Sequence, residues 1–168
     1  MIQKDKEGFL RLLEEHKLII YKICNSYCKN AGDRDDLAQE ISYQLWRSFT
    51  YFDGRVKFST WMYRVALNVA ITFYRKTKTN EAIIQLREPD TETEDSRDDT
   101  SETEKNINTL QRFINELKEL DKALMILYLE EKSYSEISEI LGITETNVAT
   151  RISRIKDKLK QKFSTINN

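Results

Sequence analysis

Apolar residues recur at helical spacing along the amino-terminal half of the chain. They fall three or four positions apart across residues 9–27, and again across residues 37–49. Such spacing places apolar side chains on one face of a helix, where they can pack into a core. Residues 30–32 separate the two runs, and the carboxylates of residues 33–36 suit the start of a new helix. The pattern predicts two amphipathic helices in an all-α fold.

A third helix is expected after a loop at residues 51–58. The Asp-Gly pair in this loop is typical of turns, and Ser59 is a plausible cap for a helix that runs to Arg75. Residues 54–78 contain aromatic side chains and cations but no acid. Rings beside cations can stack on unpaired bases and hold phosphates, although a core helix with a basic end would look similar.

The carboxy-terminal part carries the sharpest local signal. Ser133 and Glu136 have the spacing of a capping box at the start of a short helix, and Gly142 permits a left-handed turn after it. Thr144 can cap a longer basic helix whose apolar stripe spans residues 148–163. Two helices joined in this way are typical of a DNA-binding helix-turn-helix motif. Two short helices are expected before the motif, at residues 110–117 and 122–130, the second capped by Asp121.

Charge divides the chain into segments. With four Gly and one Pro among 168 residues, there is little of the turn chemistry that an all-β fold needs. Residues 80–106 have a net charge of −7, whereas the remaining residues have a net charge of +6. The acidic segment has too few apolar residues to fold alone. We therefore predict two small helical domains, residues 1–79 and 107–168, joined by an acidic flexible linker at residues 80–106, which is either a solvated spacer or a nucleic-acid mimic that lies in a basic channel of a partner.

Few residues favour catalysis or metal binding. The sequence has a single histidine and lacks a Gly-rich phosphate loop, a nucleophile elbow and a His-Glu-x-x-His motif. His16, Cys24 and Cys28 offer three metal ligands, but they fall on one helical run with no fourth ligand nearby. We expect the cysteines to pack as small hydrophobic side chains, and we expect no enzyme activity, metal or cofactor.

The location of the protein can also be predicted. No apolar run is long enough to span a bilayer, and the amino terminus lacks the apolar core of a signal peptide. Two cysteines are too few for a secreted disulfide scaffold. We expect a cytoplasmic protein without membrane insertion.

Two sets of motifs are similar to those of bacterial sigma factors. The first set is Asp33-Arg34-Asp35-Asp36-Leu37-Ala38-Gln39-Glu40, Leu45-Trp46 and Phe58-Ser59-Thr60-Trp61-Met62-Tyr63-Arg64-Val65-Ala66-Leu67-Asn68. The second set is Leu120-Asp121-Lys122, Ser133-Tyr134-Ser135-Glu136-Ile137 and Leu141-Gly142-Ile143-Thr144-Glu145-Thr146-Asn147-Val148. They resemble regions two and four of RNA polymerase sigma factors of the extracytoplasmic-function (ECF) group of the sigma-70 family, in the family's order.

The resemblance implies three partners: core RNA polymerase, promoter DNA and an anti-sigma factor. It implies that one helix docks on the clamp coiled coil of the largest polymerase subunit through Asp36, Gln39, Glu40, Tyr43 and Trp46. It also implies that the loop and the third helix capture the non-template strand of the minus-ten element, with a flipped base held in the loop. The candidate residues for this contact are Tyr51, Phe52, Arg55, Lys57, Phe58, Trp61, Arg64, Asn68 and Arg75.

For region four, the resemblance implies that the second helix of the motif reads the minus-thirty-five element. The candidate residues are Thr146, Asn147, Thr150, Arg151, Arg154, Lys156 and Lys158. We expect one of the two arginines to make a bidentate contact to guanine and the other to contact phosphate.

Two other functions compete with this interpretation. A stand-alone helix-turn-helix transcriptional regulator would explain the carboxy-terminal half only, because the basic, acid-free amino-terminal surface suits melted DNA rather than a dimer interface. A metal-dependent nuclease would use Asp33, Asp35, Asp36 and Glu40. These acids lie at a helix start, where carboxylates are expected in any case, and no lysine or histidine accompanies them as a base.

Overall fold

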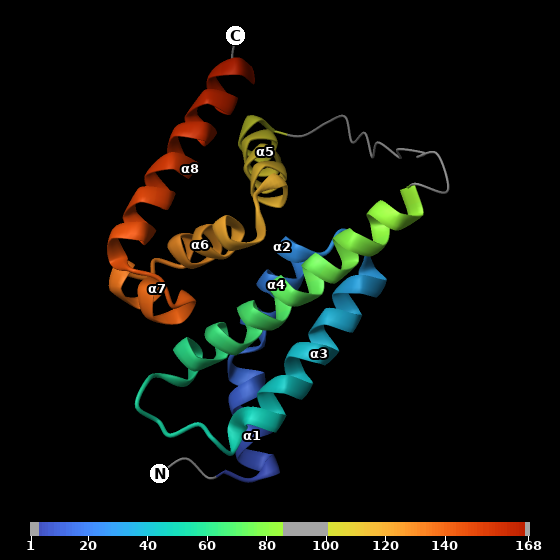
Figure 1. Cartoon of the computed structure of the whole chain (residues 1–168), viewed down its shortest axis with the longest axis vertical. Coiled ribbons are helices and arrows are strands. Elements are labelled where there is room, and N and C mark those ends of the chain that lie inside the picture. Colours follow the sequence, from blue (N-terminus) through green and yellow to red (C-terminus); the bar gives the residue numbers. More distant parts are fainter. Residues whose placement is uncertain (1–3, 86–100, 167–168) are drawn as a thin grey trace.

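A computed structural model describes residues 4–85 and 101–166 of the chain (Figure 1). These residues form helices and no strand, which confirms the all-α prediction. The helices are α1 (Lys6–Glu15), α2 (Lys17–Tyr27), α3 (Ala31–Phe49), α4 (Phe58–Gln85), α5 (Glu102–Glu116), α6 (Glu119–Leu129), α7 (Tyr134–Leu141) and α8 (Glu145–Ile166).

The first apolar run forms two helices rather than one. The backbone of His16 leaves the helical region at φ −115° and ψ 14°, between α1 and α2. The imidazole Nδ1 donates to the Leu12 carbonyl at 2.9 Å and stabilises this break. Because only one residue is interrupted, apolar spacing continues across it, so Phe9 on α1 and Ile20 on α2 both enter the core. Periodicity alone therefore predicted a single helix.

The third helix is longer than expected at both ends. It begins at Phe58, one residue before the predicted cap Ser59, and it continues to Gln85. No Gly or Pro follows until Pro89, so nothing in residues 76–85 breaks the helix. Residues 80–85 of the predicted linker are therefore helical, while residues 86–100 lie outside the described residues.

Helices α5 and α6 also begin earlier than expected. Ser101 caps α5 by accepting a hydrogen bond from the Glu104 N–H at 3.3 Å, so residues 102–106 of the predicted linker are helical as well. Helix α6 begins at Glu119, with Lys118 at the cap and no side-chain hydrogen bond. Asp121 was expected to cap this helix and instead lies within its first turn.

The helix-turn-helix motif has the predicted local structure. Ser133 and Glu136 exchange hydrogen bonds with each other's backbone N–H, at 3.1 and 2.8 Å. Gly142 adopts the left-handed conformation at φ 68°, which turns the chain from α7 toward α8. Thr144 accepts from the Asn147 N–H at 3.1 Å and caps α8.

The two halves of the chain pack against each other along α4. Helices α2, α3 and α4 form the amino-terminal bundle, and α6 and α7 contact the other side of α4 (Figure 1). Helix α2 additionally contacts α5 and α6. Buried side chains of both halves belong to one continuous apolar cluster. The contact therefore has a hydrophobic centre.

A lysine lies at the centre of this junction. Lys122 of α6 is 1% exposed, and its ammonium donates to the Asn115 carbonyl at 3.2 Å. The same nitrogen lies 4.6 Å from the ring centroid of Tyr74 on α4 and 5.1 Å from that of Tyr27 on α2. Both rings belong to the other half of the chain, so cation–π contacts join the two halves.

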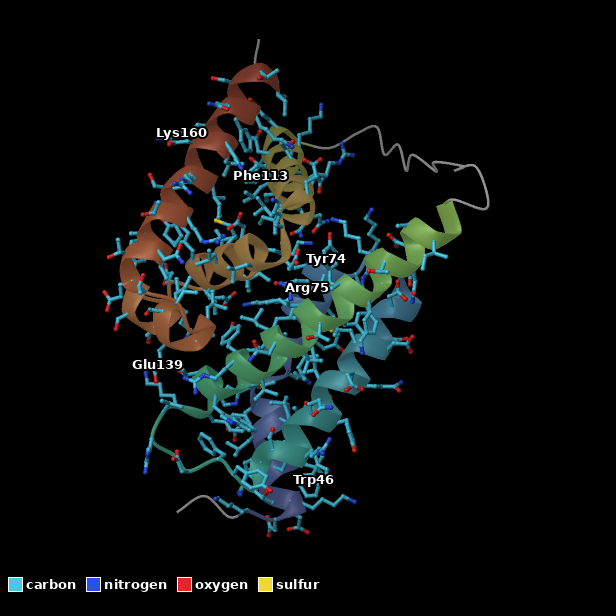
Figure 2. The ribbon with its side chains drawn as sticks, in the orientation of Figure 1. Trp46, Tyr74, Arg75, Phe113, Glu139 and Lys160 are labelled. Carbon is cyan, nitrogen blue, oxygen red and sulfur yellow. The ribbon has the colours of Figure 1, made fainter. Side chains whose placement is uncertain are left out.

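Further polar contacts join the two halves. The Tyr27 hydroxyl donates to the Glu119 carbonyl at 2.7 Å, and Arg75 forms an ion pair with the Glu119 carboxylate at 2.7 Å. Arg64, nearer the start of α4, donates to the Glu139 carbonyl of α7 at 3.2 Å. Figure 2 shows Tyr74 and Arg75 on the side of α4 that faces α6. Carboxylates and a carbonyl of the carboxy-terminal half thus hold two cations of α4.

We expect the pH dependence of stability to show the burial of Lys122. Burial, with the neighbouring charges of Lys29 and Lys78, lowers the pKa of Lys122 to about 8. In the unfolded chain the pKa of this amine is ~10.4. Between these two pKa values the unfolded chain binds more protons than the folded protein, so the contribution of Lys122 to the free energy of unfolding rises with pH. Below about pH 8 the penalty for burying the charge is present in full.

The measurement is urea unfolding of wild type and Lys122→Met from about pH 7.5 to about pH 9.5. Wild type should gain stability relative to the variant as pH rises, by up to about 1.4 kcal/mol per pH unit. The difference between the two proteins is needed because burial also raises the pKa of Cys28 to about 11 and of Cys24 to about 12, which acts in the opposite direction. A difference that does not change with pH would contradict the interpretation.

Candidate functional site

One face of α3 presents the residues predicted to bind polymerase. Asn30 caps the helix by accepting from the Asp33 N–H at 2.7 Å, and Leu37, Ile41, Leu45 and Phe49 bury the opposite face. Tyr43 is 56% and Trp46 44% exposed, beside three exposed polar side chains. The polar members of this face are Asp36, Gln39 and Glu40. We call these five residues the α3 face.

Trp46 has a structural contact as well as an exposed edge. Its ring lies 5.1 Å from that of Phe9 on α1, with the planes tilted by 56°. Figure 2 shows Trp46 near the end of the molecule that is remote from α8. The residue thus covers the core on one side and offers an apolar surface on the other.

The loop between α3 and α4 separates its aromatic residues into two environments. Tyr51 is 84% exposed, and Arg55 and Lys57 are exposed too. In contrast, Phe52 is 3% and Phe58 is 8% exposed. Their rings lie 5.8 Å apart and belong to a cluster that includes Phe49 and Trp61.

This burial bears on the minus-ten prediction. A ring that is enclosed by the core cannot stack on a base in this conformation, so Phe52 and Phe58 support the loop rather than form its surface. No sequence signal indicated this difference in burial, because residues in a loop have no periodicity that separates inside from outside. Apolar residues on both sides of a turn, as here around Gly54 at φ 76°, often close the loop on the core.

The α4 candidates are also divided. Asn68 is exposed, whereas Tyr63 and Leu67, which alternate with the predicted contacts, are buried. Arg64 and Arg75 are engaged by Glu139 and Glu119 of the other half. Trp61 is half-buried in the loop cluster.

A groove of about 660 Å³ lies between α3 and α4. Asp36 and Glu40 line one wall, and Asn68, Thr72 and Lys76 line the other. Two residues predicted to bind polymerase and one predicted to bind DNA therefore line the same groove. Sequence spacing placed these residues on separate helices and did not indicate that they share a surface.

The long helix α8 presents most of its predicted DNA contacts to solvent. Val148, Ile152 and Ile155 bury one side of it against α6 and α7. Figure 2 shows Lys160 on the outer side of this helix. The exposed candidates are Thr146, Asn147, Thr150, Arg154 and Lys158.

Two of the α8 cations that were predicted to contact DNA make internal contacts instead. The Arg151 guanidinium donates to the Asp121 carboxylate at 2.9 Å and to the Asn147 side-chain oxygen at 3.1 Å. The Lys156 ammonium lies 4.4 Å from the ring centroid of Tyr128. The sequence did not indicate these internal contacts, because the carboxylate and the ring come from distant positions.

The described residues also bear on the predictions about the cysteines, metal ligands and membrane-spanning helices. Cys24 and Cys28 are 4% and 7% exposed and pack in the core, as predicted, and burial is the main cause of the raised pKa of each thiol. No group of three His, Cys, Asp or Glu side chains is arranged to hold a metal ion within residues 4–85 and 101–166. In the same part of the chain, every helix is too short or too polar to cross a membrane.

Comparison with known proteins identifies both halves. Residues 12–79 match the family Sigma-70 region 2, and residues 107–159 match the family Sigma-70, region 4. The chain is 30% identical over 170 residues to the ECF RNA polymerase sigma factor SigW of Bacillus subtilis, covering 95% of this chain and 90% of that protein. The chain belongs to the ECF group of the sigma-70 family. It is also 28% identical over 174 residues to the ECF RNA polymerase sigma-E factor of Haemophilus influenzae, with coverage of 98% and 92%.

Solved structures share the fold. CnrH in complex with the cytosolic domain of CnrY superposes with a TM-score of 0.68 at 18% identity, covering 96% of this sigma factor and 90% of CnrH. RpoE of Bartonella quintana, in complex with the anti-sigma factor NepR, superposes with a TM-score of 0.63 at 16% identity, covering 90% and 95%. As a sigma factor, this protein directs core RNA polymerase to specific promoters and promotes DNA melting.

We expect the buried and the exposed aromatic residue of the loop to contribute very differently to stability. Phe52→Ala removes a buried ring and should lower the free energy of unfolding by about 3 to 5 kcal/mol. Tyr51→Ala changes an exposed ring and should leave stability within about 0.5 kcal/mol of wild type. Urea unfolding of both variants measures this, and an equal loss of stability in the two would mean that the loop packs differently.

Proposed function

We propose that the α3 face is the surface by which this sigma factor binds core polymerase. The support is geometric: three polar side chains and two partly exposed rings share one face of a helix whose other side is fixed in the core. Carboxylates beside exposed aromatic surface suit a basic coiled coil, because the rings supply apolar burial and the acids supply charge complementarity. The clamp coiled coil of the largest subunit is the partner that the family resemblance implies.

Melted minus-ten DNA is proposed to bind the exposed part of the loop and of α4. Tyr51 offers a ring for base stacking, Arg55 and Lys57 offer charge for phosphates, and Asn68 offers donors and an acceptor for a base edge. Phe52 and Phe58 then act by holding the loop in shape. Flipping a base costs a few kcal/mol, so a loop fixed in advance by a ring cluster lowers the remaining cost of ordering.

Duplex minus-thirty-five DNA is proposed to bind the exposed side of α8. Thr146, Asn147 and Thr150 lie in the first turns, where a recognition helix contacts base edges, and Arg154 and Lys158 lie further along, where it contacts phosphates. The observation that carries the whole proposal is the presence of both regions, at residues 12–79 and 107–159, in one chain. A stand-alone regulator would account for the second region alone.

We also propose that an anti-sigma factor controls this protein. We propose further that this sigma factor itself acts in the cytoplasm and catalyses no reaction. The structural relatives are bound to the cytosolic domain of CnrY and to the anti-sigma factor NepR. The junction between the halves supports such control, because Arg64 and Arg75 are held by region-four groups while the halves are closed. A protein that stabilised this arrangement would keep both arginines in their ion pairs with region-four carboxylates.

Transcription in vitro tests the proposal. Core polymerase with this chain should produce promoter-specific RNA, and Gln39→Ala combined with Trp46→Ala should reduce it by weakening core binding. Because Trp46 also packs on Phe9, thermal unfolding of the variant must be measured alongside.

Tyr21→Ala is a matched control, since Tyr21 is 62% exposed on α2 and lies outside the α3 face. It should bind core polymerase as wild type does. Normal core binding by the Gln39, Trp46 double variant would show that the α3 face is not the docking surface. Absence of promoter-specific RNA with the wild-type chain would contradict the proposed function itself.

A further inference from the structure

One carboxylate of α6 reaches across to the recognition helix. Asp121 lies in the first turn of α6, and its side chain is 19% exposed. It does not cap its own helix, because α6 begins at Glu119 with Lys118 at the cap. Its carboxylate instead accepts a hydrogen bond from Arg151 Nη1 of α8 at 2.9 Å, across a separation of 30 residues.

Arg151 makes a second hydrogen bond, to a residue at the start of α8. Its Nε donates to the Asn147 Oδ1 at 3.1 Å, one helical turn earlier. Asn147 is exposed in the first turn of α8, where a recognition helix contacts base edges. A chain of hydrogen bonds thus runs from the partly buried Asp121 through Arg151 to the exposed Asn147. We call these three residues the relay.

We propose that Asp121 is a positioning residue for promoter readout, acting through Arg151 on the side-chain amide of Asn147. The inference rests on the proposed function of α8. A guanidinium has donors only, so the amide oxygen of Asn147 must be the atom that faces Arg151. The amide nitrogen, with its two donors, then faces the DNA.

This orientation sets a base preference. Guanine presents two acceptors, O6 and N7, in the major groove, whereas cytosine presents a donor there. The bidentate pairing of asparagine with adenine needs the amide oxygen as well as the nitrogen, and in the relay this oxygen is turned toward Arg151 rather than toward the DNA. Asn147 should therefore favour guanine at the base pair that it contacts.

The relay also assigns Arg151 a role different from the one expected from the sequence. Its Nε and one Nη1 proton are used inside the protein, and the Asp121 carboxylate offsets its charge locally. Removing the carboxylate should consequently have two opposite effects. Base preference at one position should fall, while affinity for DNA of any sequence should rise, because the surface gains a positive charge that can reach phosphates.

This pair of effects separates a positioning role from a structural one. If the ion pair only stabilised the packing of α6 on α8, its loss would weaken binding to all sequences in proportion. Neither a gain in general affinity nor a loss confined to one base pair would follow.

The experiment is a selection of minus-thirty-five sequences from a randomised promoter library by holoenzyme. It compares full-length wild type with Asp121→Ala, Asn147→Ala and the double variant. Both single variants should reduce the preference for guanine about fivefold to tenfold at the same position. The double variant should reduce it no further, because the two residues act in series.

Three controls accompany the selection. Glu145→Ala removes an exposed carboxylate from the first turn of α8 and should raise general affinity without changing the selected base. Asp121→Glu keeps the carboxylate and should restore much of the preference. Arg151→Lys cannot hold both partners in a fixed geometry and should lose the preference as Asp121→Ala does, which keeps the test decisive if Asp121→Ala folds poorly.

Two results would contradict the inference about Asp121 without contradicting the proposed function of α8. One is an unchanged selected sequence with Asp121→Ala, and the other is a loss of preference at a position different from that lost with Asn147→Ala. Failure of the wild-type holoenzyme to select any sequence would instead contradict the proposed function of α8.

Discussion

The ammonium of Lys122 is the group around which the two halves are arranged. Region four supplies the amine and the Asn115 carbonyl, while region two supplies the faces of Tyr27 and Tyr74. Burying a cation with one carbonyl and two rings leaves part of its solvation unreplaced, and the lowered pKa of the amine records that cost. Opening the halves would return the amine to water. Apolar burial therefore has to stabilise the contact between the two halves.

The predicted fold was correct where a local rule determines the structure. Ser133, Glu136 and Gly142 satisfy backbone groups within a few residues, so their spacing alone specifies a helix start and a helix end. The break at His16 escaped prediction because an interruption of one residue leaves the apolar period almost unchanged. The length of α4 was not predicted, because the acidic composition was taken to mark the end of the helix. Helix propensity and the absence of a helix-breaking residue instead extend it to Gln85.

The candidate site divides in the same way. Helical periodicity separates the exposed α3 face from Leu37, Ile41 and Leu45, and the structure bears this out. It could not separate Tyr51 from Phe52 in a loop. Nor could it pair Arg75 with Glu119, because the two lie 44 residues apart and meet only through the packing of the two halves. Contacts between distant residues depend on tertiary packing, and these contacts decide which cations are paired within the protein.

The cations of α8 illustrate how that packing divides affinity from specificity. Arg154 and Lys158 extend from the exposed side of the helix and are suited to phosphates, whose attraction is independent of sequence. Arg151 and Lys156 are turned inward onto Asp121 and Tyr128. A cation held in this way contributes less to general attraction, but it can fix the direction of a neighbouring donor. Base edges differ in their pattern of hydrogen-bond donors and acceptors, so a side chain must be oriented to distinguish them. Internal contacts of a recognition helix can therefore sharpen its readout while they reduce its sequence-independent attraction for DNA.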